Sequence, residues 1–154
     1  MREKRVAKAA LVILALLVGS CSGNMSAGYR AVYLVRSAGD ETSRVLGAYG
    51  DEQAKKCKGS SSTAAEFDEC IKPTKKILSK WITIVKPAIN TALLATFASL
   101  ETAREKKESC EWIRLIKPGL CALIAALDEW DPLIGEKLQP VKKYLNLVEG
   151  VVCK

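Results

Sequence analysis

The feature that most constrains the fold is a set of helix-start signals with no hairpin signal between them. Thr63-Ala-Ala-Glu66 has the spacing of a capping box, in which the threonine hydroxyl and the glutamate carboxylate each accept from a backbone N–H group. Asp131-Pro132 is a typical N-cap and first-turn pair. No Asn-Gly or Asp-Gly dipeptide, the usual sign of a tight β-hairpin, occurs in the chain. The sequence therefore predicts an all-α fold.

These signals and the periodic apolar residues divide the chain into about four helices, which we expect to form a small bundle. Residues 29–35 fit a strand or a helix, and we favour the helix. Pro73 and Pro87 fall within the longest helical segment. Each removes an N–H donor, so we expect kinks or joins there. The expected helices cover residues 40–54, 63–107, 109–130 and 131–152.

The N-terminus has the layout of a secretory signal peptide. Residues 1–8 carry basic side chains, residues 9–18 are apolar, and Gly19 and Ser20 precede Cys21. The apolar run is about half of the roughly 20 residues that a membrane-spanning helix needs. An uncleaved signal anchor is the alternative interpretation.

Within this segment, Val18-Gly19-Ser20-Cys21 resembles the lipobox of bacterial lipoproteins. The resemblance implies cleavage before Cys21 and a diacylglycerol on its sulfur, which would tether the protein to a membrane of the bacterial cell envelope. Ser22, in place of Asp, implies the outer membrane, at its periplasmic or surface face. The chain would then comprise a signal peptide (1–20), a flexible tether (21–28) and one helical domain (29–154).

Charge and composition exclude several classes of function. The formal charge of +7 falls to +4 without residues 1–20, which is too weakly basic to indicate a nucleic-acid-binding surface. The chain contains no histidine, so histidine-based catalysis and histidine-ligated metals are excluded. We expect no enzymatic activity, no cofactor and no bound metal.

The five cysteines after Cys21 have spacings unlike those of zinc or haem sites, and an oxidising compartment favours disulfides. Cys57 and Cys70 flank a serine-rich loop that a disulfide would close. Cys110 and Cys153 would come level if the last two helices form an antiparallel hairpin. We therefore predict Cys57–Cys70 and Cys110–Cys153, with Cys121 left as a buried thiol.

Two apolar stretches, residues 87–100 and 120–127, are candidates for the core. The first is apolar nearly all round, which is typical of the buried centre of a bundle or of a membrane-active segment. Its fourteen uncharged residues after Lys86 are too few to span about 30 Å of hydrocarbon. We favour the buried central helix and keep a membrane-inserting hairpin of the two stretches as the alternative.

Lysines are concentrated on one face of the second expected helix. Lys72, Lys76 and Lys80 follow at intervals of four residues, with Lys75 beside them. Such a stripe could contact anionic lipid headgroups or an acidic partner, although a solvated face is the more common explanation.

An apparent repeat relates Trp81–Pro87 to Trp112–Pro118, which share Trp, Ile, Lys and Pro in register. Two short copies leave duplication and coincidence equally open.

Together these features predict a lipid-anchored, disulfide-stapled helical protein that acts as a non-enzymatic binding module and docks another envelope protein. The alternative is a membrane-perturbing or lipid-binding protein that uses the two apolar stretches and the lysine stripe.

Overall fold

The protein is all-helical, as the sequence predicts. A computed structural model describes residues 25–106 and 111–145, and within these ranges only residues 61–63 lie outside helices. The elements are α2 (Met25–Ser60), α3 (Ala64–Lys80), a short π-helix η1 (Trp81–Val85), α4 (Lys86–Lys106) and α5 (Glu111–Leu145).

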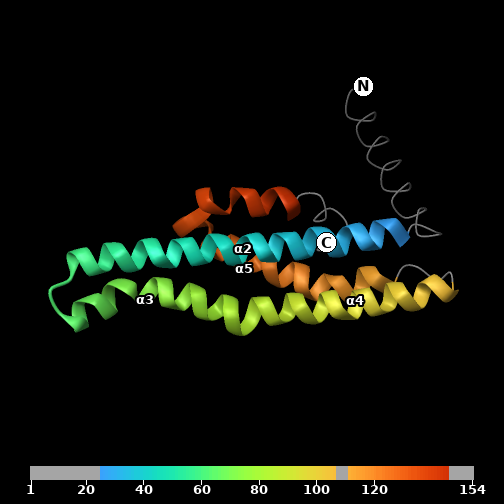
Figure 1. Ribbon diagram of the computed structural model, residues 1–154, viewed down its shortest axis with the longest axis horizontal. Coiled ribbons are helices and arrows are strands. Elements are labelled where there is room, and N and C mark those ends of the chain that lie inside the picture. Colours follow the sequence, from blue (N-terminus) through green and yellow to red (C-terminus); the bar gives the residue numbers. More distant parts are fainter. Residues whose placement is uncertain (1–24, 107–110, 146–154) are drawn as a thin grey trace, which may run out of the picture.

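Three long rods make up the described bundle (Figure 1). The first is α2, and the second is the continuous run of α3, η1 and α4, which returns antiparallel to α2 after the turn at residues 61–63. The third rod, α5, packs against both α2 and α4.

The third rod bends at Ile134, whose backbone has φ −139° and ψ 20°. Beyond this residue α5 turns back and lies beside α2 (Figure 1). Lys142 forms an ion pair with Asp131 across the bend, although a straight helix would separate these residues by roughly 16 Å. α5 thus consists of two helical segments joined at Ile134, and the boundary between them lies three residues after Asp131, where the sequence places the start of a separate helix.

Both irregularities lie close to prolines. The π-helix ends two residues before Pro87, and the Lys86 N–H bonds to the carbonyl of Trp81, five residues back. The Ile134 bend follows Pro132 by two residues. Since proline lacks an N–H and crowds the preceding turn, Pro87 accounts for the wider helical turn that precedes it. Pro73, where a kink or join was also expected, lies inside the single helix α3.

The N-terminal boundary differs from the expected one. α2 begins at Met25, so residues 25–28 form its first turn and do not belong to a flexible tether. Gly28 is buried, and a Cβ there would come within 2.5 Å of Leu100 Cδ2. Glycine is typical of flexible linkers, but here it allows α2 and α4 to pack closely within the bundle.

The core is centred on α5, whereas the sequence favoured residues 87–100 as the buried helix. Its side chains along residues 120–130 fill the space between the other rods, and Trp130 meets Trp81 edge-on with ring centroids 6.4 Å apart. α4 is buried along one stripe only, since Leu94 is 73% exposed. The stretch 120–127 is buried as expected; its core residues are Leu120, Leu123, Ala126 and Leu127.

The turn between α2 and α3 has the predicted chemistry. The Thr63 hydroxyl accepts from the Glu66 N–H, and the Glu66 carboxylate accepts from the Thr63 N–H, which completes the capping box. Cys57 and Cys70 form a disulfide across this turn with 5.6 Å between their Cα atoms, which confirms that pairing.

The prediction for Cys121 is wrong. This residue is disulfide-bonded and is not a buried free thiol. It is also only partly buried, because it lies at the edge of the α5 face that enters the core. Cys110 and Cys153, the predicted second pair, lie outside the described residues.

Candidate functional site

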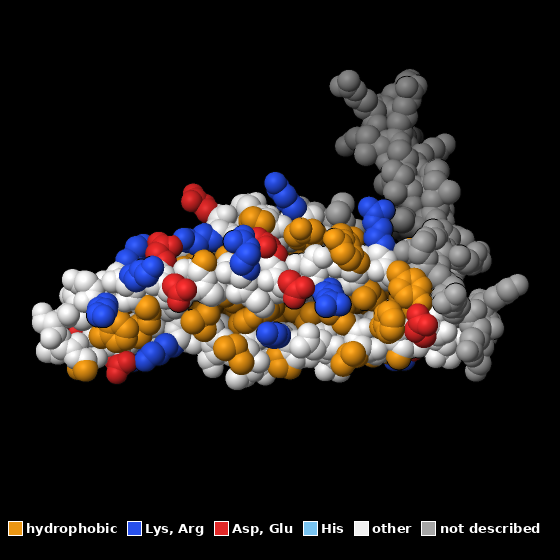
Figure 2. Space-filling model, in the orientation of Figure 1, with side chains coloured by type: hydrophobic (Ala, Val, Ile, Leu, Met, Phe, Trp, Pro, Cys, Tyr) orange, Lys and Arg blue, Asp and Glu red, His pale blue; other side chains and the backbone are white. Residues whose placement is uncertain are grey.

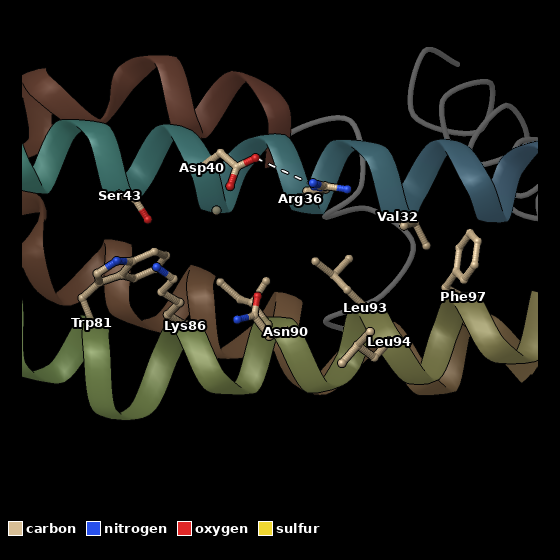
Figure 3. A pocket seen from close by; sticks show the side chains of 12 residues that line it. Val32, Arg36, Asp40, Ser43, Trp81, Lys86, Asn90, Leu93, Leu94 and Phe97 are labelled. Carbon is tan, nitrogen blue, oxygen red and sulfur yellow. Dashed lines mark ion pairs between the residues drawn. The ribbon is translucent and has the colours of Figure 1, made fainter.

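An open groove of about 530 Å³ runs between α2 and the rod formed by η1 and α4 (Figure 3). α2 and α4 are antiparallel, so Val32 faces Phe97 at one end of the groove and Ser43 lies near Lys86 and Trp81 at the other. The helical rise gives a length of roughly 16 Å over the eleven steps from Lys86 to Phe97. The lining residues are Val32, Arg36, Gly39, Asp40, Ser43, Trp81, Lys86, Ile89, Asn90, Leu93, Leu94 and Phe97.

The floor of the groove is apolar and belongs to the core. Trp81 and Ile89 line it while being almost completely buried. At the rim, Leu94 is 73% and Phe97 is 49% exposed. Single exposed apolar residues are common, but here two of them border a continuous apolar floor. The groove therefore offers apolar surface that no described segment covers.

The other part of the groove is polar and carries two cationic side chains. Arg36 lies 4.0 Å from Asp40, and both side chains are largely exposed. Lys86 is exposed and forms no ion pair within the described ranges. Asn90 points toward the groove between Lys86 and the leucines (Figure 3). An anionic group entering at this end would meet one uncompensated cation in Lys86.

The apolar end of the groove continues into an aromatic contact. Tyr29 on α2 and Phe97 on α4 meet edge-on, with ring centroids 6.1 Å apart. The Tyr29 hydroxyl donates a hydrogen bond to the Glu101 carboxylate. Tyr33, one turn after Tyr29, is 67% exposed. Figure 2 shows hydrophobic side chains gathered on this face, beside the N-terminal end of α2.

The lysine stripe is largely compensated by carboxylates. Lys76 is the exception, since it has no ion pair with any described residue. Two of the compensating carboxylates lie on α3 itself, and the third is supplied by α5, which the sequence alone does not place beside the stripe. The pairs are Lys72 with Glu69 at 3.0 Å, Lys75 with Asp68 at 2.8 Å, and Lys80 with Glu129.

The clearest perturbed acid is Glu52 on α2, and its environment indicates a structural role. Hydrogen bonds from Lys137 and Lys56, with their charges, lower the pKa of Glu52 to about 2. A carboxyl group so strongly held in its ionised form is a poor general acid or base near neutral pH. No group of three or more potential metal ligands occurs among the residues that the structure describes.

The rod containing α4 also meets the length and composition criteria for a membrane span. Residues Ala64–Thr102 form a helix with a window apolar enough to cross a bilayer, and only 22% of that window is buried. Core helices of water-soluble proteins meet the same criteria.

Comparisons with known proteins add no assignment: no family model, curated protein or solved structure matches this chain. The lipobox and Cys21 lie outside the described residues. The groove was not predicted from the sequence, although the adjacent apolar pair Leu93 and Leu94 makes the apolar face of α4 wider than one buried stripe needs.

Proposed function

We propose that this chain is a lipid-anchored, non-enzymatic binding module of the bacterial cell envelope, tethered through Cys21 and carrying its binding surface in the α2–α4 groove. The lipobox resemblance supports the anchor and favours the outer membrane, at its periplasmic or surface face. The proposed partner is another envelope protein.

The observation that carries the proposal is the groove itself, in which the apolar floor of Trp81 and Ile89 lies beside the exposed polar side chains of Lys86 and Asn90. An apolar side chain of a partner placed there would be removed from water, which is favourable by roughly 25 cal/mol for each Å² of apolar surface buried. Lys86 and Arg36 would favour a partner with an acidic residue near the polar end. An elongated groove between two helices is the geometry that amphipathic helices occupy in many complexes.

The anchor is tested by the intact mass of the protein purified from bacterial membranes without reduction, before and after thiol alkylation. A mass of residues 21–154 plus acyl chains, with one alkylatable thiol, is the expected result. A full-length mass with every cysteine alkylatable would reject both lipoprotein processing and the disulfides.

The groove is tested by photocrosslinking in the producing cells. A photoreactive phenylalanine analogue replaces Asn90 in one variant and Ser62, an exposed residue of the α2–α3 turn, in a matched control. We expect a discrete envelope-protein adduct from position 90 only, weakened by Lys86→Glu. Equal adducts from both positions, or none from either, would reject the groove as the docking site.

A second function, membrane perturbation, is favoured by the low burial of the apolar window in Ala64–Thr102. Lys76 would be the lysine of the stripe most available to anionic headgroups, because the other three have carboxylate partners. Vesicles of phosphatidylglycerol and phosphatidylethanolamine loaded with dye test this function. Leakage that Leu94→Lys abolishes, with helicity unchanged, would support it, and absence of leakage would reject it.

A further inference from the structure

We infer that the end of the bundle nearest the anchor makes a second contact with the membrane, through an aromatic patch that we define as Tyr29, Tyr33, Leu94 and Phe97. This inference rests on the proposed lipid anchor at Cys21. It assigns a bilayer interface as the surface that covers the patch.

The patch is continuous across two helices. Tyr33 follows Tyr29 by four residues on α2, so both side chains share one face. Tyr29 contacts Phe97 of α4 edge-on, and Phe97 follows Leu94 by three residues. Tyr33, Leu94 and Phe97 are respectively 67%, 73% and 49% exposed.

The position of the patch follows from where the described chain begins. α2 starts at Met25, four residues after Cys21, so the two Cα atoms are at most about 14 Å apart. Tyr29 lies about one helical turn beyond Met25, and its contact with Phe97 brings the α4 part of the patch to the same end. A lipid-anchored chain with so short a connection holds this end of the bundle close to the bilayer surface.

The chemistry of the patch suits that surface. Tyrosine combines an apolar ring with a polar hydroxyl and is enriched at membrane–water interfaces. Arg30 and Arg36 are exposed three residues before and after Tyr33, where they can meet anionic headgroups. Asp40 and Glu101 are the nearest described carboxylates on the two helices; the first is 4.0 Å from Arg36 and the second accepts the Tyr29 hydrogen bond.

A bilayer explains the patch better than a small ligand does. A small ligand is normally buried over most of its surface, whereas Leu94 and Phe97 lie at an open rim. A second, weaker contact beside an acyl anchor also fixes which face of the domain points away from the membrane. The polar end of the groove, with Lys86 and Asn90, would then remain accessible to a protein partner.

The test places a tryptophan in the patch of the full, lipidated protein and measures quenching by brominated phospholipids in phosphatidylglycerol–phosphatidylethanolamine vesicles. Phe97→Trp is the probe, and Leu133→Trp is the matched control, because Leu133 is 60% exposed at the bend of α5. Difference spectra against the parent protein remove the three native tryptophans. Circular dichroism establishes that both variants are folded.

We expect a loss of emission from the Phe97→Trp probe and none from Leu133→Trp, with the loss reduced by Tyr33→Ser. Vesicle flotation of the same samples reports the anchor separately. Flotation without quenching at position 97 overturns the patch contact and leaves the anchor intact. Absence of both flotation and quenching overturns both proposals, and equal quenching at positions 97 and 133 shows that the domain has no preferred contact.

Discussion

Gly119 of α5 lies directly against Ala92 of α4. A Cβ placed on Gly119 would come within 2.7 Å of Ala92 Cβ and within 3.0 Å of the Ala88 carbonyl oxygen and of Ile89 Cα. Two of these three neighbours are backbone atoms, which cannot yield by a change of rotamer. The two helices therefore approach each other at a point where only glycine fits.

The Gly119→Ala variant should consequently be destabilised, even though alanine is the better helix former. Forcing the helices apart at a packed contact typically costs about 1–3 kcal/mol. Chemical denaturation followed by circular dichroism measures the change in the free energy of unfolding.

Gly47→Ala is the matched control in α2. Gly47 is exposed, and a Cβ there would meet no atom within 4 Å, so the substitution should stabilise the protein by about 0.4–1 kcal/mol. Similar effects of the two substitutions would show that α4 and α5 are less closely packed than the structure has them.

Glu52 should make the stability of the bundle dependent on acid pH. Its carboxylate accepts from Lys56 at 2.8 Å and from Lys137, which lies beyond the bend of α5. The pKa of Glu52 falls from 4.5 to about 2 in the fold, so its stabilising effect is complete above pH 4.5 and is lost as the pH falls toward 2.

The melting temperatures of the parent protein and Glu52→Gln, measured across this range, test the effect. The parent should be the more stable at pH 6, and the gap should close on acidification. A gap that stays constant down to pH 2 would mean that the ion pairs do not link α2 to the C-terminal part of α5.

Local sequence signals predicted the local structure well. The capping box needs only Thr63, Glu66 and the backbone between them, and the Cys57–Cys70 disulfide needs only a short loop between two helix ends. All-helical structure follows from periodicity and from the absence of turn dipeptides. None of these features depends on distant parts of the chain.

Features that depend on which helices meet were not predicted. Residues 87–100 carry no charged side chain, but burial depends on how extensively neighbouring helices pack, and α5 packs more extensively against α2 than α4 does. The mistaken choice of residues 87–100 as the centre follows from this. The groove could not be predicted for the same reason, because it forms only where α2 and α4 lie side by side. In the sequence, its polar residues Arg36, Asp40 and Asn90 look like ordinary surface residues.

Removal of the Cys57–Cys70 disulfide should destabilise the end of the bundle formed by α2 and α3. A loop of this length constrains the unfolded chain by roughly 3 kcal/mol in the chain-entropy model. The Cys57→Ser/Cys70→Ser double variant should therefore have a lower free energy of unfolding by about 2–4 kcal/mol, measured by urea denaturation. An unchanged midpoint would show that the capping box alone holds the turn.

The partner of Cys121 can be derived from the geometry of α5. Ten helical residues place Cys121 roughly 15 Å from Glu111, and Cys110 is one residue from Glu111. With about 3.8 Å between consecutive Cα atoms, Cys110 stays roughly 11 Å or more from Cys121, beyond the limit of about 7 Å for a disulfide.

Because the proposed lipid occupies Cys21, Cys153 is then the remaining candidate to bond Cys121. The bend at Ile134 turns the last part of α5 back beside α2, and Cys153 lies eight residues beyond Leu145. Proteolysis of the unreduced, alkylated protein should yield a Cys121–Cys153 peptide pair and an alkylated Cys110. A Cys110–Cys153 pair with an alkylated Cys121, the pairing that the sequence suggested, would instead require Cys121 to be free and would contradict the structure.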